Sequence, residues 1–125
     1  MISHTILGTN DLEKAALFYS KILSKIGGTQ IFKSDTVIFW ELEGGGSKLA
    51  LTVPFDGQPA SNGNGTMVAF TISSVNEVDE IFSMALTLGA SSEGAPGERN
   101  DGAYYGAYFR DLDGNKIAIF HRKVS

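Results

Sequence analysis

The feature that most constrains the fold of this chain is an internal repeat with a period of about half its length. Residues 2–8 alternate in the manner of a strand, and apolar residues at helical spacing follow from Asn10. Residues 66–72 and the segment that begins at Ser74 repeat this order. Further strand-like segments follow each predicted helix, so each half is predicted to have the order βαβββ. Because one helix covers only one face of a sheet, the other face of each sheet must meet something else.

Two capping-box patterns predict where the helices begin. Asn10 precedes Glu13 by three residues, and Ser74 precedes Glu77 by the same spacing. Gly27 is predicted to end the first helix, because glycine adopts the left-handed C-cap without strain. The predicted apolar stripes contain Leu12, Ala15, Ala16, Tyr19, Ile22, Leu23 and Ile26 in the first helix, and Val75, Val78, Ile81, Phe82, Ala85 and Leu86 in the second.

The remaining strands are predicted from short apolar or alternating runs bounded by turn residues. They are 29–33, 36–42, 48–53, 90–93, 103–110 and 116–121. Turn-forming residues fill 54–65, and residues 94–102 are predicted to form a loop. We therefore expect a single domain, with module 1 at about 1–53, a crossover at 54–65 and module 2 at about 66–125.

The composition excludes several classes of protein. The chain has no cysteine, which excludes a disulfide framework, a thiolate zinc site and a cysteine nucleophile. The net charge is −4 and the ten Lys and Arg residues are scattered, which argues against nucleic acid as a partner. No apolar run approaches the about 18 residues of a membrane helix, and the N-terminal residues lack signal-peptide features. We therefore expect a cytoplasmic protein without a membrane partner.

Four motifs resemble the vicinal oxygen chelate superfamily, which comprises glyoxalases, bleomycin resistance proteins and ring-cleaving (extradiol) dioxygenases. The motifs are the strand with His4, the helix start 11–13 with Phe18-Tyr19, the stretch 64–70 and the segment 111–117. They cover the whole chain in order and spacing. The resemblance implies an α+β fold of two βαβββ modules, with a curved mixed sheet around a small-molecule pocket, in a protein that is usually a homodimer. A ferredoxin-like βαββαβ domain is the alternative fold, and it has fewer strands after each helix.

Members of this superfamily that use a metal hold a divalent cation on the concave face of the sheet. By resemblance, the four ligand positions fall on His4, Ala50, Met67 and Ala118. Alanine has no donor atom, and the Met67 thioether is a soft ligand that does not suit hard divalent cations. His4 is thus the one remaining ligand-type residue. We predict no metal and no other cofactor, and a divalent metal is implied by the resemblance alone.

Strand parity predicts which side chains face the pocket. The predicted pocket residues are His4, Ala50, Thr52, Met67, Ala69, Tyr108 and Ala118. Parity also places Tyr104 on this face, with its hydroxyl expected at the surface, and His121 on the opposite face. Trp40 is either a stacking wall or a core residue. Arg99 is interpreted as a solvated loop charge, with an anion anchor as the alternative.

The residues leave several functions open. The small and apolar lining favours a metal-free protein that binds a small apolar or aromatic molecule. The alternative is an enzyme, either a metal-dependent lyase or dioxygenase of the same superfamily with unorthodox ligands, or a metal-free isomerase in which His4 and Tyr108 are catalytic. His4 could equally be a hydrogen-bonded residue without a chemical role. A third hypothesis is a structural or regulatory dimer whose cavity is filled by apolar side chains.

Overall fold

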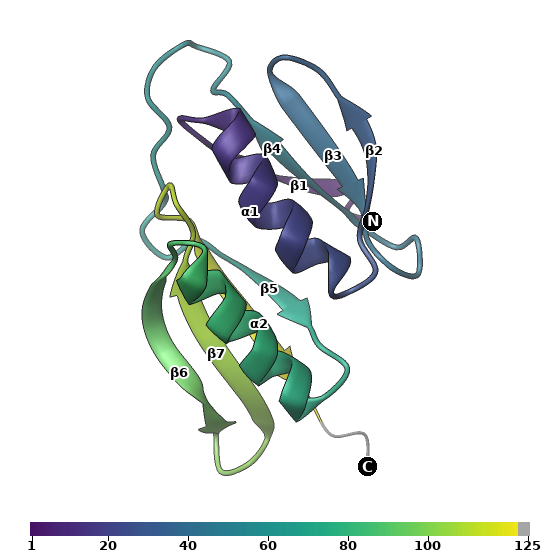
Figure 1. Cartoon of the computed structure of the whole chain (residues 1–125), viewed down its shortest axis with the longest axis vertical. Coiled ribbons are helices and arrows are strands. Elements are labelled where there is room, and N and C mark those ends of the chain that lie inside the picture. The colour runs from purple at the N-terminus through teal and green to yellow at the C-terminus, as the bar shows by residue number, and fades with distance from the viewer. Residues whose placement is uncertain (123–125) are drawn as a thin grey trace. The chain divides into compact units, whose positions relative to one another are not determined.

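The chain forms two compact units, Met1–Asn62 and Gly63–Ser125, in a computed structural model that describes residues 1–122. Each unit has the order βαβββ, and its helix lies across one face of a four-stranded sheet (Figure 1). The predicted α+β fold of two such modules is confirmed, and the ferredoxin-like alternative is wrong because three strands follow each helix. Within residues 1–122, no helix has the length and apolar character needed to cross a membrane.

Module 1 has its strands in the order β1-β4-β3-β2, with β1 parallel to β4 and the other neighbours antiparallel. Its elements are β1 (His4–Gly8), α1 (Leu12–Ser24), β2 (Thr29–Lys33), β3 (Val37–Glu41) and β4 (Lys48–Thr52). Alternate side chains of β3 and β4 are buried on the face that α1 covers, among them Ile38, Leu49 and Leu51. Trp40 lies among them and is 2% exposed, so it is a core residue and not a stacking wall.

Module 2 repeats this arrangement with the order β5-β8-β7-β6. Its elements are β5 (Met67–Thr71), α2 (Val75–Thr87), β6 (Ser91–Arg99), β7 (Tyr104–Arg110) and β8 (Lys116–His121). The core between the sheet and α2 contains fully buried side chains from both layers, including Phe109, Ile117 and Ile119 on the strands and Val78 and Ile81 on the helix. Each module therefore has a packed face and a face without a helix.

The helix starts agree with the predictions in one module only. In α2 the amide of Glu77 donates to the Ser74 hydroxyl at 3.1 Å, as predicted. In α1 the predicted cap Asn10 is wrong, because the side chain of Asp11 accepts the bond from the first turn. The Asn10 carboxamide oxygen instead accepts a 2.7 Å bond from the amide of Ala60, which ties the segment after β4 to the start of the helix.

The apolar stripes of the helices differ from the prediction at their margins. Phe18, which the helical pattern omitted, is 1% exposed and belongs to the core. Leu86, which the pattern included, is 38% exposed. Both lie at the edge of a stripe, where the local shape of the sheet decides whether a side chain is covered.

The predicted loop at 94–102 is wrong over most of its length, because β6 is a nine-residue strand that runs from Ser91 to Arg99. It is the edge strand of its sheet, and Pro96, which lacks an amide proton, lies within the second of its two register shifts, between Gly94 and Gly97. The hairpin turn to β7 has Asp101 and Gly102 at its centre, with φ of 55° and 85°. Positive φ at both positions defines a type I′ turn, for which Asp-Gly is a strong signal.

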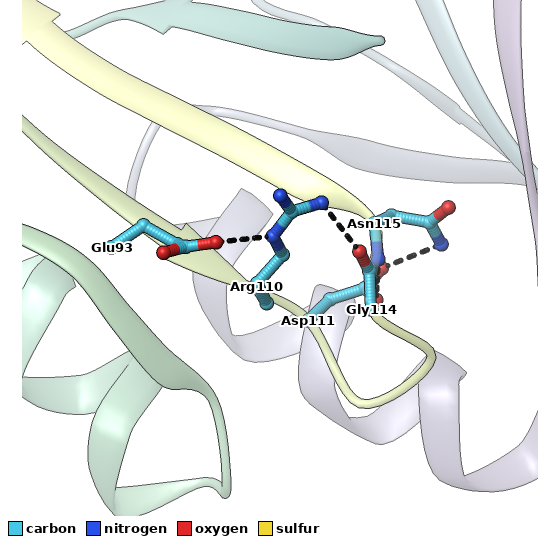
Figure 2. A network of polar contacts seen from close by, with 5 residues as sticks. All are labelled: Glu93, Arg110, Asp111, Gly114 and Asn115. Atoms are coloured by element: carbon cyan, nitrogen blue, oxygen red, sulfur yellow. Dashed lines mark hydrogen bonds and ion pairs between the residues drawn. The ribbon is translucent and has the colours of Figure 1, made fainter. Parts of the chain in front are cut away.

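The turn from β7 to β8 is held by the buried carboxylate of Asp111 (Figure 2). Its Oδ1 accepts hydrogen bonds from the amides of Asp113 and Asn115, both at 2.9 Å, and its Oδ2 accepts one from the Asn115 side chain at 3.0 Å. On the strand beside it, Nη1 of Arg110 donates to the carbonyl of Gly114 at 3.1 Å. These bonds fix where β7 ends and β8 begins, and hence the register between the two strands.

Replacing Asp111 should therefore destabilise the protein. We expect Asp111→Ala to lower the free energy of unfolding by about 3 kcal/mol, because hydrogen bonds to a charged group contribute about 1.5–3 kcal/mol and buried donors lose their acceptor. Urea denaturation monitored by circular dichroism measures this change. The control is Asp35→Ala at an exposed turn position, for which a change within about 0.5 kcal/mol is expected. Equal effects of the two substitutions would contradict the role given to the Asp111 turn.

Candidate functional site

The helix-free face of module 2 carries the candidate site. The register pairs Tyr108 with Ala118 and Ala118 with Ala69, so these three side chains form a row across β7, β8 and β5. A depression of about 190 Å³ lies over this row. Its lining consists of Met67, Ala69, Tyr104, Tyr108, Ala118, Phe120 and Arg122. We call this depression the module 2 pocket.

Small residues on the sheet create the room for the pocket. Ala118 forms the floor and is 4% exposed, and a larger side chain there would fill the space beside Tyr108. A Cβ atom at Gly106 would lie 3.0 Å from Cε2 of Tyr104, and one at Gly94 would lie 3.2 Å from Cδ2 of Tyr108. Both contacts are shorter than an ordinary van der Waals contact. The two tyrosine rings can therefore lie against the sheet because the residues beneath them are glycines.

The two tyrosines of the pocket form a hydrogen-bonded pair. Their hydroxyl oxygens are 2.6 Å apart, and the Tyr104 ring meets the Phe120 ring edge to face at 5.9 Å between centroids. The bond to Tyr104, together with burial, raises the pKa of Tyr108 above its ordinary value. Tyr108 is thus protonated at neutral pH. One proton of the pair lies between the two oxygens, which leaves one proton to donate to a ligand.

The Tyr104 hydroxyl, which was expected at the surface, is bonded to the Tyr108 hydroxyl at the pocket. Tyr104 is half-buried and bonded to Tyr108. The sequence contains a signal for this pairing, since residues four apart on one strand share a face and Gly106 between them leaves the face uncovered.

Two cations flank the ring of Tyr108. The guanidinium carbon of Arg99 lies 5.7 Å from the ring centroid, and Nζ of Lys116 lies 5.6 Å from it. Both distances are in the range of a cation–π contact. Arg99 also donates from Nη2 to the carbonyl of Ala95 at 2.6 Å. The interpretation of Arg99 as a solvated loop charge is wrong, because this residue ends a strand and packs beside the pocket.

The other predicted pocket residues lie on the helix-free face of module 1. His4 is exposed on β1, where its Nδ1 is 3.0 Å from the hydroxyl oxygen of Ser3 and its ring meets Phe39 edge to face at 5.0 Å. Ala50 is buried and pairs with Phe39 across the sheet. Thr52 donates its hydroxyl proton to the carbonyl of Val53 at 2.9 Å. The structure thus gathers the predicted residues Met67, Ala69, Tyr108 and Ala118 in one pocket and places the other three on module 1.

The donor atoms at the positions implied by the resemblance do not fit a divalent cation. Ala50 and Ala118 have no donor, and Met67 presents a thioether. Over residues 1–122, no group of three or more His, Asp, Glu or Cys side chains is arranged to hold a metal ion. The second histidine, His121, lies on the opposite strand face, as parity predicts, and its Nδ1 is 2.9 Å from the carbonyl of Ile72. We therefore derive no chemical step through a metal.

Sequence reasoning missed two lining residues of the module 2 pocket, Phe120 and Arg122, whereas parity had already placed Tyr104 on this face. Tyr104 and Phe120 lie on the strand face that parity assigns to Tyr108 and Ala118. The signal was present for Phe120, which alternates with Ala118 along β8. Arg122 follows the last residue of β8, so strand alternation does not assign it a face.

Comparisons with known proteins place this fold among related sequences and structures. The family model of the Glyoxalase/Bleomycin resistance protein/Dioxygenase superfamily matches residues 1–119. A glyoxalase/bleomycin resistance protein from Albidiferax ferrireducens T118 is 34% identical, with a TM-score of 0.87 over 98% of this chain and 99% of that one. The comparison with curated proteins found no significant match.

Two more distant structures agree with the fold alone. A glyoxalase-related enzyme from Fulvimarina pelagi is 22% identical, with a TM-score of 0.79 over 98% of this chain and 88% of that one. The genomically encoded fosfomycin resistance protein FosX from Listeria monocytogenes is also 22% identical, with a TM-score of 0.75 over 99% of this chain and 94% of that one.

The tyrosine pair can be tested by titration. Because the bond to Tyr104 is the largest cause of the raised pKa of Tyr108, we expect Tyr104→Phe to lower that pKa towards about 10, the ordinary value for tyrosine. The ¹³Cζ chemical shift of Tyr108, followed from pH 8 to 12, reports the change. Tyr105 is the internal reference, since its raised pKa depends on a 2.7 Å bond to Asp79 and should not change. An unchanged Tyr108 titration would show that the two hydroxyls are not bonded.

Proposed function

Because the chain belongs to the Glyoxalase/Bleomycin resistance protein/Dioxygenase superfamily, we propose that it is a metal-independent member that binds a small apolar or aromatic molecule in the module 2 pocket. One observation carries the proposal. The pocket combines apolar walls, a small-residue floor at Ala69 and Ala118, and a convergent hydroxyl pair. Few polar groups in an otherwise apolar hollow are typical of small-molecule sites.

The size of the pocket limits the ligand. Its volume of about 190 Å³ is below the about 300–1,000 Å³ of pockets for drug-sized ligands. A flat ring system could lie on the alanine floor between Met67 and Phe120 and place a polar atom near the tyrosine hydroxyls. The pocket also argues against the hypothesis of a closed cavity, since the apolar side chains at 67 and 118 leave this hollow open.

Binding is favoured over catalysis by the surroundings of the two proposed catalytic residues. A catalytic histidine normally needs a partner that orients it, and the partner of His4 is the hydroxyl of Ser3 rather than a carboxylate. Tyr108 can donate a proton to a ligand, but its raised pKa makes it a poor base at neutral pH. The donor set gives no support to a metal-dependent lyase or dioxygenase.

We also propose that the protein is cytoplasmic and that it forms a homodimer. Light scattering on the purified chain would test the homodimer.

Filling the pocket should weaken ligand binding. We expect flat aromatic probes such as indole and 1-naphthol to shift the backbone amide signals of Ala69 and Ala118 in NMR titrations. Ala69→Leu places a larger side chain in the space that the probe would occupy and should weaken binding about tenfold, which corresponds to about 1.4 kcal/mol.

The matched control is Thr71→Leu, two residues further along the same face of β5 but outside the lining, which should leave binding unchanged. Trp40 fluorescence is unsuitable as a reporter because this side chain is buried in the core of module 1. Probes that shift no signal of the pocket, or that bind Ala69→Leu as tightly as the wild type, would refute the proposed site.

Ligand binding should not depend on a divalent metal. We expect the affinity for these probes to be the same after dialysis against EDTA and after addition of Mn²⁺, Ni²⁺ or Zn²⁺, because positions 50 and 118 offer no donor. Elemental analysis of untagged protein provides an independent measurement, with His4→Ala as the comparison. A stoichiometric metal that is lost in His4→Ala would overturn the metal-independent part of the proposal.

A further inference from the structure

The charges of module 2 are segregated between its two faces. Residues 63–122 contain eight Asp and Glu residues but only four Lys and Arg residues, so this module is acidic overall. All four cations nevertheless lie on the helix-free face of the sheet: Arg99, Arg110, Lys116 and Arg122. Four of the acidic residues lie outside this face of the sheet. Glu77, Asp79 and Glu80 are on α2, and Asp101 is in the hairpin turn.

Most of the remaining acids are also directed away from the pocket. Glu98 pairs with Tyr105 on the face opposite Tyr104, and Asp111 and Asp113 belong to the turn between β7 and β8. Among the described residues, Glu93 is the one carboxylate that meets these cations. It forms a 2.6 Å ion pair with Nε of Arg110, and this pair lowers the pKa of Glu93 below its ordinary value (Figure 2).

Arg110 is therefore committed to structure, since its guanidinium also donates to the carbonyl of Gly114. Lys116 is close enough to Glu93 to contribute to the same lowered pKa. Among residues 1–122, Arg99 and Arg122 differ from Arg110 and Lys116 in having no carboxylate partner. Within the same residues, the ion pair on this face joins Arg110 and Glu93. Arg99 packs on the ring of Tyr108, and Arg122 lines the pocket itself.

The tyrosine pair adds directional donors to this positive field. One hydroxyl donates to the other, so the pair retains one proton that it can donate to a ligand acceptor. A chain of two hydroxyl groups becomes more polarised when its last proton is accepted by an anion, which strengthens both bonds. A neutral acceptor would use the same proton but would not interact with the arginine charges.

We propose that the ligand of the module 2 pocket is a small aromatic or apolar carboxylic acid, whose carboxylate is bound by the Tyr104–Tyr108 pair and by Arg99 and Arg122. The inference rests on the proposed function, since it names the chemical class of molecule that the same pocket takes. The apolar part of the acid lies over Ala69 and Ala118, beside Met67. The carboxylate lies at the end of the pocket that the tyrosines and arginines surround.

The test uses matched pairs of probes that differ in charge but hardly in shape. Benzoate is compared with benzamide, and 1-naphthoate with 1-naphthamide, by calorimetric and NMR titration of the full chain at pH 7. Each carboxylate is expected to bind at least about tenfold more tightly than its amide, because hydrogen bonds to a charged group are stronger than neutral ones.

Charge-removing variants then locate the anion. Arg122→Gln and Arg99→Gln should each weaken carboxylate binding about tenfold and change amide binding less than about twofold. Glutamine keeps a donor at each position, so the loss reports the charge. The control is Lys14→Gln, which removes the same charge from an exposed residue of α1 outside the pocket lining and should change neither affinity.

The outcomes separate this inference from the proposed function. Carboxylates and amides that bind equally well in the pocket would overturn the inference and leave the apolar pocket intact. Probes of both kinds that fail to bind would overturn both. If the double variant Arg99→Gln/Arg122→Gln still binds carboxylates more tightly than amides, the anion binds elsewhere, and the inference is also overturned.

Discussion

The pairing of β7 with β8 determines what the helix-free face of module 2 presents to a ligand. Side chains alternate between the two faces of a strand, so a slip of one residue would exchange the packed face for the open one. If β8 slipped against β7, Ile117 and Ile119 would leave the core, and Ala118 would turn towards it and away from Tyr108. The Asp111 turn excludes this slip because its carboxylate binds amides on the way into β8. The pocket therefore depends on a buried polar turn that contacts no ligand.

The fold could be predicted from periodicity because each module buries one face only. Alternation along β8 was sufficient to separate Ala118 from His121. The position of Trp40 was left open between a stacking wall and the core, and the structure places it in the core. The sequence was less informative where a residue's local preference conflicts with its place in the sheet. Glycine and proline disfavour strands, yet β6 contains both because it is an edge strand with shifted register. The Asp-Gly turn after it was the stronger signal, and it would have placed Arg99 on a strand.

The side-chain contacts of the module 2 pocket could not be predicted from the sequence. Parity put Tyr104 and Tyr108 on one face, but their hydrogen bond also requires both rings to lie close to the sheet. That arrangement depends on Gly106 and Gly94. These glycines were not recognised as pocket residues because they have no side chain that could line the pocket. Alanine at 118 has two consequences at once. It removes a donor from the metal position that the resemblance implies, and it leaves the space beside Tyr108 that a ligand can fill.

Ion pairing explains only part of the distribution of charge in module 2. Ion pairing accounts for Arg110, whose partner Glu93 lies on the neighbouring strand β6. It does not account for arginines at 99 and 122, which bring positive charge to an apolar hollow in a module that is acidic overall. Charges of one sign around a hollow with low-dielectric walls focus the field and raise the local concentration of an oppositely charged ligand. An anion that enters the hollow would therefore interact favourably with both arginines.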